Sequence, residues 1–225
     1  MICNLDDLMK TAESLSSRLK NAGVRFDARG FPLLPRESYL DEWPDRFIDY
    51  SHRNGSVVQD KSKTAVCFFS PDCQLFPRLE KVYEELPKYQ GFMAVAGLDL
   101  TVTQDMDFEY QSYLMLVNAL FMGALAVNGV KVVPNLRSGN RATVELLSYV
   151  PTGVLWVSSS LGCRSLKSPS DTMFLEKTLY VRPSKLALYG KSDGLAEEQL
   201  SRVGIDWRRY PDTHAQYRAR DAAAS

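Results

Sequence analysis

Five short apolar runs, each separated from the next by a stretch of helical character, constrain the fold of this chain most. The runs are residues 65–69, 91–98, 130–135, 153–158 and 185–190. Strands that alternate with helices are typical of βαβ units, which build parallel sheets. The runs are apolar throughout, which indicates strands buried on both faces. The sequence therefore predicts an α/β fold with about five parallel strands, either an open sheet or a partial (β/α) barrel.

The stretches that separate the runs predict the helices of this fold. They lie at about 75–86, 108–127, 141–150 and 172–181. The most apolar part, 113–127, is shorter than the ~20 residues that a membrane span needs. It also contains Asn118. We therefore interpret it as a helix buried against the sheet.

The region before the first run predicts an N-terminal helical extension. Asn4 is a suitable helix N-cap, and apolar residues at spacings of three and four follow it until Gly23. A proline-containing strap, a helix-like stretch interrupted by Pro44 and a polar loop then lead to the first run. The predicted parts of the chain are a helix and strap at 1–63, an α/β domain at 64–206 and a polar tail at 207–225.

Charge and targeting signals narrow the classes of function. The 225 residues include 27 Lys and Arg and 27 Asp and Glu, which gives a net charge of +0. This balance argues against a protein that coats nucleic acid or an anionic membrane through bulk charge. The N-terminal residues lack the basic and apolar regions of a signal peptide. We therefore expect a cytoplasmic protein with no membrane association and with reduced thiols.

Cysteine and histidine residues form no compact metal-binding motif. There is no Cys-x-x-Cys pair, and His52 and His214 are far apart in the sequence. We predict no structural disulfide, and we interpret both histidines as solvated side chains. The four cysteines are Cys3, Cys67, Cys73 and Cys163.

The ends of the predicted strands carry a resemblance to a known family. It rests on residues 66–72, 91–100, 128–134, 151–159 and 186–191, together with the glycine-proline segment at 30–34. These segments resemble the domain of unknown function DUF4417, which is found in bacteria, phages and mobile elements. The family has no established activity. The resemblance therefore implies a phage or mobile-element setting and no particular chemistry.

Polar residues after the predicted strands locate the expected site. In open α/β sheets and barrels, ligands bind at the carboxyl ends of the strands. The sequence places carboxylates on the early loops and basic residues on the later ones. Carboxylates can hold Mg²⁺, and arginines can pair with a phosphate. The candidate ligand-binding residues are Asp72, Asp99, Asn135, Arg137, Ser158 and Lys191.

Asp99 is the candidate metal ligand in this set, with Mg²⁺ as the metal that a carboxylate suits. It ends an otherwise apolar run. Because consecutive right-handed crossovers align the strand ends, we expect Asp99, Arg137 and Ser158 to converge on one cleft.

The absence of a diagnostic catalytic motif leaves open whether the protein is an enzyme. The leading hypothesis is that it binds or processes a nucleotide or another phosphate-containing ligand at the carboxyl ends of the strands. One alternative is a nucleic-acid-associated accessory protein, since the tail at 207–210 mixes bases and aromatics. The other is an interaction protein that binds and modulates a host protein.

Overall fold

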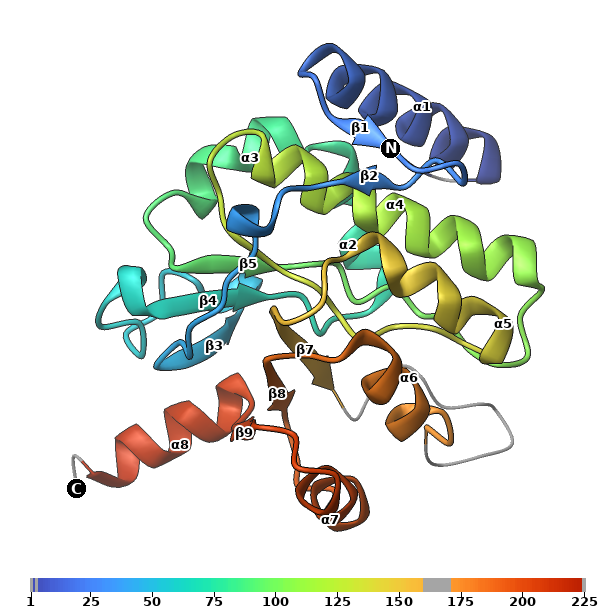
Figure 1. Ribbon diagram of the computed structural model, residues 1–225. Helices are drawn as coiled ribbons and strands as arrows, with labels where there is room; N and C mark the ends of the chain where they lie inside the picture. The colour runs from blue at the N-terminus through green and yellow to red at the C-terminus, as the bar shows by residue number, and fades with distance from the viewer. Residues whose placement is uncertain (1, 3, 160–170, 224–225) are drawn as a thin grey trace.

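Two sheets, each made of parallel strands, form the centre of the computed structural model (Figure 1). The structure describes residues 2, 4–159 and 171–223. Their strand orders are β3-β4-β5-β6 and β7-β8-β9, and all neighbours run parallel. The α/β class is therefore confirmed. The strands are β3 (Arg46–Asp49), β4 (Thr64–Cys67), β5 (Ala94–Ala96), β6 (Val132–Val133), β7 (Leu155–Ser159), β8 (Lys185–Tyr189) and β9 (Trp207–Tyr210).

Helices cover the sheets, and a short antiparallel pair, β1 (Arg25–Phe26) with β2 (Pro32–Leu33), precedes them. The α-helices are α1 (Leu5–Asn21), α2 (Asp72–Glu80), α3 (Val82–Tyr89), α4 (Phe108–Ala126), α5 (Arg141–Val144), α6 (Phe174–Val181), α7 (Gly194–Arg202) and α8 (Thr213–Ala223). The 3₁₀ helices are η1 (Arg36–Ser38), η2 (Tyr50–His52), η3 (Lys61–Lys63) and η4 (Glu145–Tyr149).

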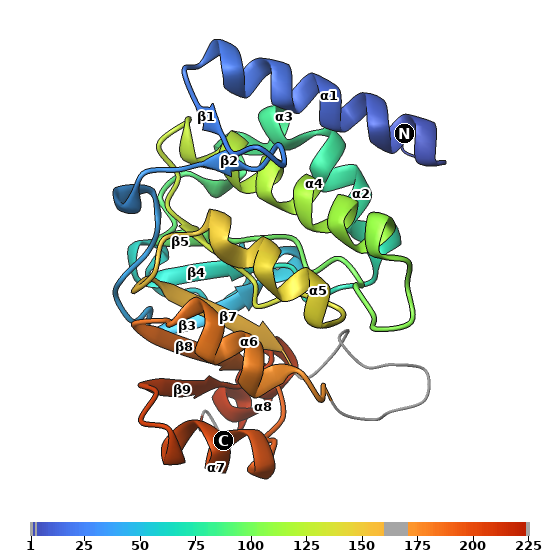
Figure 2. The ribbon, with the colours of Figure 1, turned by 45° about the vertical axis from the view of Figure 1, so that its right-hand side comes forward.

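The apolar helix α4 is buried along most of its length, as the sequence predicted. Leu120 at its centre is completely inaccessible to solvent. The N-terminal helix α1 packs beside α4 (Figure 2). In the part of the chain that the structure describes, no helix combines the length and apolar character that crossing a membrane requires.

The predicted number of five strands is wrong, because the described residues contain seven parallel strands. β3 lies in the stretch that the sequence predicted as helix-like, and β9 lies in the predicted polar tail. β3 closely follows Pro44, and only its two central residues, Phe47 and Ile48, are buried. β9 buries only Tyr210, so its pattern lacks the apolar character of the other strands. Both sheets therefore extend beyond the predicted domain at 64–206.

Alternate residues of the strands enter two different cores, as the pleat of a strand requires. Ile48, Val66, Val95 and Trp156 belong to the larger core that the helices cover. The residues next to them in the chain belong to an inner cluster to which all seven strands contribute. This inner cluster comprises Leu40, Phe47, Ala65, Cys67, Ala94, Ala96, Val133, Leu155, Val157, Ala187, Tyr189 and Tyr210.

Backbone hydrogen bonds join the two sheets between β6 and β7. Asn135 forms a parallel bridge with Val157, whose oxygen accepts from the Leu136 N–H at 2.8 Å. At the amino ends of the strands, Leu40 donates to the Val132 oxygen at 3.0 Å and accepts from the Leu155 N–H at 3.1 Å. The segment before β3 thus inserts Leu40 between the sheets.

Side chains connect the C-terminal elements to β3 at the other end of the strand series. The Tyr210 hydroxyl donates to the Pro44 oxygen at 2.8 Å, and Gln216 Nε2 donates to the Phe47 oxygen at 2.7 Å. The Asp49 N–H donates to Thr213 Oγ1 at 3.0 Å. The first and last parallel strands are therefore held near each other by side chains.

The described cysteines are free thiols, buried at Cys67 and exposed at Cys73. Cys3 and Cys163 lie outside the described residues, so the prediction that the chain has no structural disulfide stays a prediction.

Candidate functional site

Asp99 and Arg137 meet in a buried ion pair at the carboxyl ends of β5 and β6. The guanidinium donates from Nε and Nη2 to the two carboxylate oxygens of Asp99. Their side chains are 6% and 5% exposed. Burial raises the pKa of the Asp99 carboxyl, and the charge of Arg137 opposes this effect. The pair ties together the loops that follow the two strands.

Asp72 and Asn135 fix the same group of loops. Asp72 Oδ1 accepts two hydrogen bonds from Thr101, one from the backbone N–H at 3.0 Å and one from the side-chain Oγ1 at 3.1 Å. Asn135 Nδ2 donates to the Gly97 oxygen at 2.7 Å. Both contacts join segments that are far apart in the sequence. Together with the Asp99–Arg137 ion pair they form one polar cluster, which we call the Asp99 cluster.

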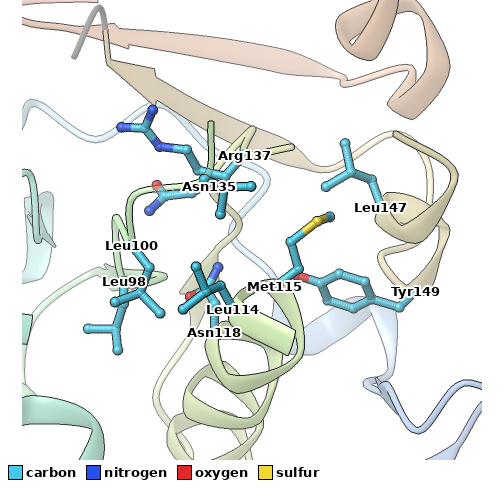
Figure 3. Close-up of a pocket in the computed structure, with 10 residues that line it drawn as sticks. Leu98, Leu100, Leu114, Met115, Asn118, Asn135, Arg137, Leu147 and Tyr149 are labelled. Carbon is cyan, nitrogen blue, oxygen red and sulfur yellow. The ribbon is translucent and has the colours of Figure 1, made fainter. Parts of the chain in front are cut away.

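A small cavity adjoins the Asp99 cluster, between α4 and the loops after β5 and β6 (Figure 3). Its volume is about 10 Å³. That is about the space that one water molecule occupies. Asn118, Asn135 and Arg137 line it among apolar side chains that include Met115. The cavity is therefore too small for a nucleotide or any other organic ligand.

The geometry around Asp99 does not fit the predicted magnesium site. Arg137 engages both carboxylate oxygens of Asp99. Among the residues that the structure describes, no group of three or more His, Cys, Asp and Glu side chains is placed to hold a metal ion. We therefore assign the Asp99 cluster to the stability of the fold.

A much larger cavity, of about 890 Å³, lies at the carboxyl ends of strands from both sheets. This volume is typical of sites for small organic ligands. Its walls come from the segments after β3, β4, β8 and β9 and from the last residue of β7. The lining residues are Asp49, Ser51, His52, Phe69, Ser70, Pro71, Ser159, Tyr189, Gly190, Lys191, Ser192, Asp193, Gly194, Asp212, Thr213 and His214.

Lys191 is the residue of the predicted set that lines this large cavity. Ser158 is buried in β7, and because side chains alternate along a strand, its neighbour Ser159 lines the cavity instead. The predicted convergence of Asp99 and Arg137 is found, but it occurs in the separate Asp99 cluster.

Asp49 organises the wall of the large cavity that follows β3. Its Oδ1 accepts from the Ser51 N–H at 2.9 Å and from Ser51 Oγ at 2.5 Å, and its Oδ2 accepts from Ser70 Oγ at 3.0 Å. Ser51 Oγ also lies 2.8 Å from Nδ1 of His52. The Asp49 carboxylate thus holds the 3₁₀ turn that carries His52.

The wall that follows β9 carries His214 at the start of α8. The Thr213 N–H donates to the Tyr189 hydroxyl at 3.0 Å, and the hydroxyls of the two residues lie 3.0 Å apart. Burial raises the pKa of the Tyr189 hydroxyl well above its ordinary value, so this group stays protonated. The imidazole rings of His52 and His214 have centroids 5.6 Å apart and are inclined by 78°. The fold therefore brings the two histidines into contact.

The loop at 190–194, between β8 and α7, forms a third wall. Gly190 has a φ of 106°, a conformation that favours glycine. Asp193 Oδ1 accepts from the Ala196 N–H at 3.2 Å, which caps α7. Lys191 is exposed in this loop. In the same cavity, the rings of Phe69 and Tyr189 stack with centroids 4.7 Å apart.

Sequence reasoning missed both histidines as site residues because the strands before them were not recognised. One local signal could have revealed the second strand. Pro71-Asp72 begins α2 and is separated from the end of β4 by three residues, and Pro211-Asp212 separates β9 from α8. This repeated pattern marks a strand end followed by a helix start.

Comparison with protein families gives one match. The sequence matches the family DUF4417, a domain of unknown function, over residues 26–208, which is most of the chain. Comparisons with curated proteins and with solved structures give no match.

Proposed function

We propose that this chain, which belongs to the DUF4417 family, binds a nucleotide or a related phosphate-containing ligand in the large cavity. The observation that carries the proposal is the composition of that cavity. Lys191, both histidines and the stacked rings of Phe69 and Tyr189 line one space of about 890 Å³. Such a space has the size and the mixed polar and aromatic lining that a nucleotide requires.

We infer that the seven strands form an incomplete (β/α) barrel around the inner cluster. All seven contribute side chains to that cluster, and Tyr210, Thr213 and Gln216 bridge the space between β9 and β3. The large cavity then lies at the mouth of the barrel. In (β/α) barrels this end binds the ligand, often with a phosphate on loops from late in the chain.

The wall formed by residues 190–194 supports a phosphate at this mouth. Lys191 supplies a positive charge, and the N-terminal end of α7 adds the partial positive charge of its backbone N–H groups. Asp193 caps the same helix, so the lysine and the backbone share this region with one carboxylate. Asp49 and Asp212 offer acceptors for the hydroxyl groups of a sugar.

The basic and aromatic residues of β9 favour a free ligand over a nucleic-acid strand. The Arg208 guanidinium lies 4.6 Å from the centroid of the Trp43 ring, and Trp207 Nε1 donates to Ser201 Oγ at 3.1 Å. The Tyr210 hydroxyl is bonded to Pro44. Packing thus uses most of the side chains that suggested nucleic-acid binding. The cytoplasmic location, the phage or mobile-element setting and a host-protein partner stay predictions.

Calorimetric titration of the purified chain with AMP, ADP, adenosine and inorganic phosphate tests this proposal. We expect AMP or ADP to bind more tightly than adenosine. Lys191→Ala should weaken nucleotide binding by about 10- to 100-fold, which corresponds to the loss of one hydrogen bond to a charged group. Lys131→Ala, an exposed lysine at the amino end of β6, should leave the affinity unchanged. Failure of both nucleotides to bind at about 1 mM, or equal binding by the Lys191 variant, contradicts the proposal.

A further inference from the structure

The contact between His52 in η2 and His214 in α8 depends on the tertiary fold and not on the local structure of either segment. Hydrogen bonds within η2 account for the position of His52, but His214 arrives from the opposite end of the strand series. Gly55 shows how closely α8 approaches that turn. A Cβ atom at this position would lie 1.9 Å from the Tyr217 hydroxyl oxygen, so a side chain here would have to displace the Tyr217 ring. The Tyr217 and His52 rings are also in contact, with centroids 5.7 Å apart.

The hydrogen bonds of Ser51 define which nitrogen of His52 carries the proton. A serine hydroxyl has a single proton, and Ser51 donates it to the Asp49 carboxylate at 2.5 Å. In the 2.8 Å contact between Ser51 Oγ and His52 Nδ1, the imidazole must therefore be the donor. Neutral His52 then has its lone pair on Nε2. A histidine held in this way is prepared to accept a proton.

We propose that His52 and His214 are the proton acceptor and the proton donor for hydrolysis of a nucleoside phosphodiester in the large cavity. This inference rests on the proposed function, because it assigns a reaction to the same ligand site. It follows from two imidazoles in contact, one of them oriented by Asp49 through Ser51, beside the cationic Lys191 in a single cavity.

The reaction balances with water as the second substrate. His52 Nε2 takes a proton from water as the water oxygen forms a bond to phosphorus. The phosphorus–oxygen bond to the leaving group breaks, its electron pair stays on that oxygen, and protonated His214 donates a proton to it. The products are a phosphomonoester and an alcohol, and proton exchange with solvent restores both histidines. Lys191 stabilises the charge on the phosphoryl oxygens.

Hydrolysis of 2′,3′-cyclic AMP and of bis(p-nitrophenyl) phosphate, with AMP binding measured in parallel, tests the inference. We expect the wild-type chain to hydrolyse at least one of the two diesters. His52→Gln and His214→Gln should each lower kcat by about 100-fold or more, the usual contribution of a general acid or base. Both variants should still bind AMP, so that a loss of turnover is distinguished from a loss of the ligand site, and Lys131→Ala should keep full activity.

The possible results separate the two proposals. A chain that binds AMP but hydrolyses neither diester overturns the reaction and leaves the proposed function standing. A histidine variant that keeps the wild-type kcat also overturns the reaction. A chain that neither binds AMP nor hydrolyses the diesters overturns both.

Ser51 provides an independent test as a positioning residue. Ser51→Ala keeps the backbone N–H that bonds to Asp49 but removes the hydroxyl between Asp49 and His52. We expect kcat to fall about tenfold with KM unchanged, and Ser51→Thr to restore it. A fall in kcat of the same size in Ser51→Ala and Ser51→Thr contradicts the orienting role of Ser51. A change in KM without a change in kcat also contradicts it.

Discussion

The Asp99 cluster and the large cavity are both built from polar side chains at the carboxyl ends of strands, yet their partners differ. In the Asp99 cluster, Asp99 and Arg137 are buried and bind each other. In the cavity, Lys191 and His214 are exposed, and Asp49 is held by the short hydroxyl side chains of Ser51 and Ser70. Position at a strand end is therefore not enough to identify a ligand site. Burial and the identity of the partner distinguish a charge that stabilises the fold from one that lines the large cavity.

The largest expected effect comes from breaking the Asp99–Arg137 ion pair. Arg137→Ala leaves the Asp99 carboxylate buried without its partner, and such losses cost about 3–5 kcal/mol in the free energy of unfolding. Urea denaturation measures this change. Arg141→Ala removes an arginine whose side chain is 86% exposed, and it should cost less than about 0.5 kcal/mol. If the two variants are equally stable, the Asp99 cluster does not stabilise the fold, and the contrast with the large cavity fails.

A second, intermediate effect is expected at Glu85 on α3, a buried acid outside both regions. Burial raises the pKa of Glu85, but contacts from Lys88, Tyr89 and Arg78 outweigh it and bring the pKa below its ordinary value of 4.5. The charged form therefore stabilises the fold above about pH 4.5, and this contribution is lost as the pH falls through the lowered pKa.

Glu85→Gln should accordingly cost about 1.5–3 kcal/mol at pH 7, the range for hydrogen bonds to a charged group. The difference from wild type should narrow as the pH falls below 4.5, as measured by urea denaturation at a series of pH values. Glu84→Gln, at the exposed neighbouring position, is the matched control. A difference that stays constant with pH contradicts the assignment.

Lys191→Ala should change the free energy of unfolding by less than about 0.5 kcal/mol, because exposed side chains contribute little to stability. The same urea titration measures this value. A loss as large as that of Arg137→Ala would show that the cavity wall is structural and would remove the contrast between the two regions.

The last prediction concerns the chemical reactivity of Cys67, a buried thiol whose pKa is affected by the charges of Asp49 and Asp99. Burial raises its pKa well above the ordinary value, and the two carboxylates raise it further. Since the thiolate is the reactive form, iodoacetamide at pH 7.5 should modify exposed Cys73 and leave Cys67 unmodified in the folded chain. Peptide mass spectrometry measures both sites, and modification of Cys67 at the rate of Cys73 contradicts its burial.

The central part of the fold could be predicted from the sequence because its strands are buried on both faces. Ala65, Val66 and Cys67 of β4 are all buried, so the run is apolar and easily recognised. The outermost strands, β3 and β9, were not predicted because they contain few buried residues. In β9, Arg208 and Arg209 are exposed and only Tyr210 is buried.

The candidate site could be predicted in location but not in most of its residues. The rule that ligands bind at strand ends led to Lys191 through its place after β8. It led equally to Asp99, and no sequence pattern shows that the Asp99 carboxylate is paired with Arg137. The meeting of His52 and His214 depends on β3 and β9, the two strands that local pattern did not identify.

The walls of the large cavity come from both ends of the strand series, which has a consequence for synthesis. Asp49 and His52 leave the ribosome before most of the strands, whereas Thr213 and His214 leave it after both sheets. Chains fold from the N-terminal side as they are made. A nascent chain can therefore assemble much of its core while the cavity still lacks the wall formed by α8. The proposed ligand site is therefore complete only after α8 has been made, and a chain that stops before residue 213 would lack one wall of the large cavity.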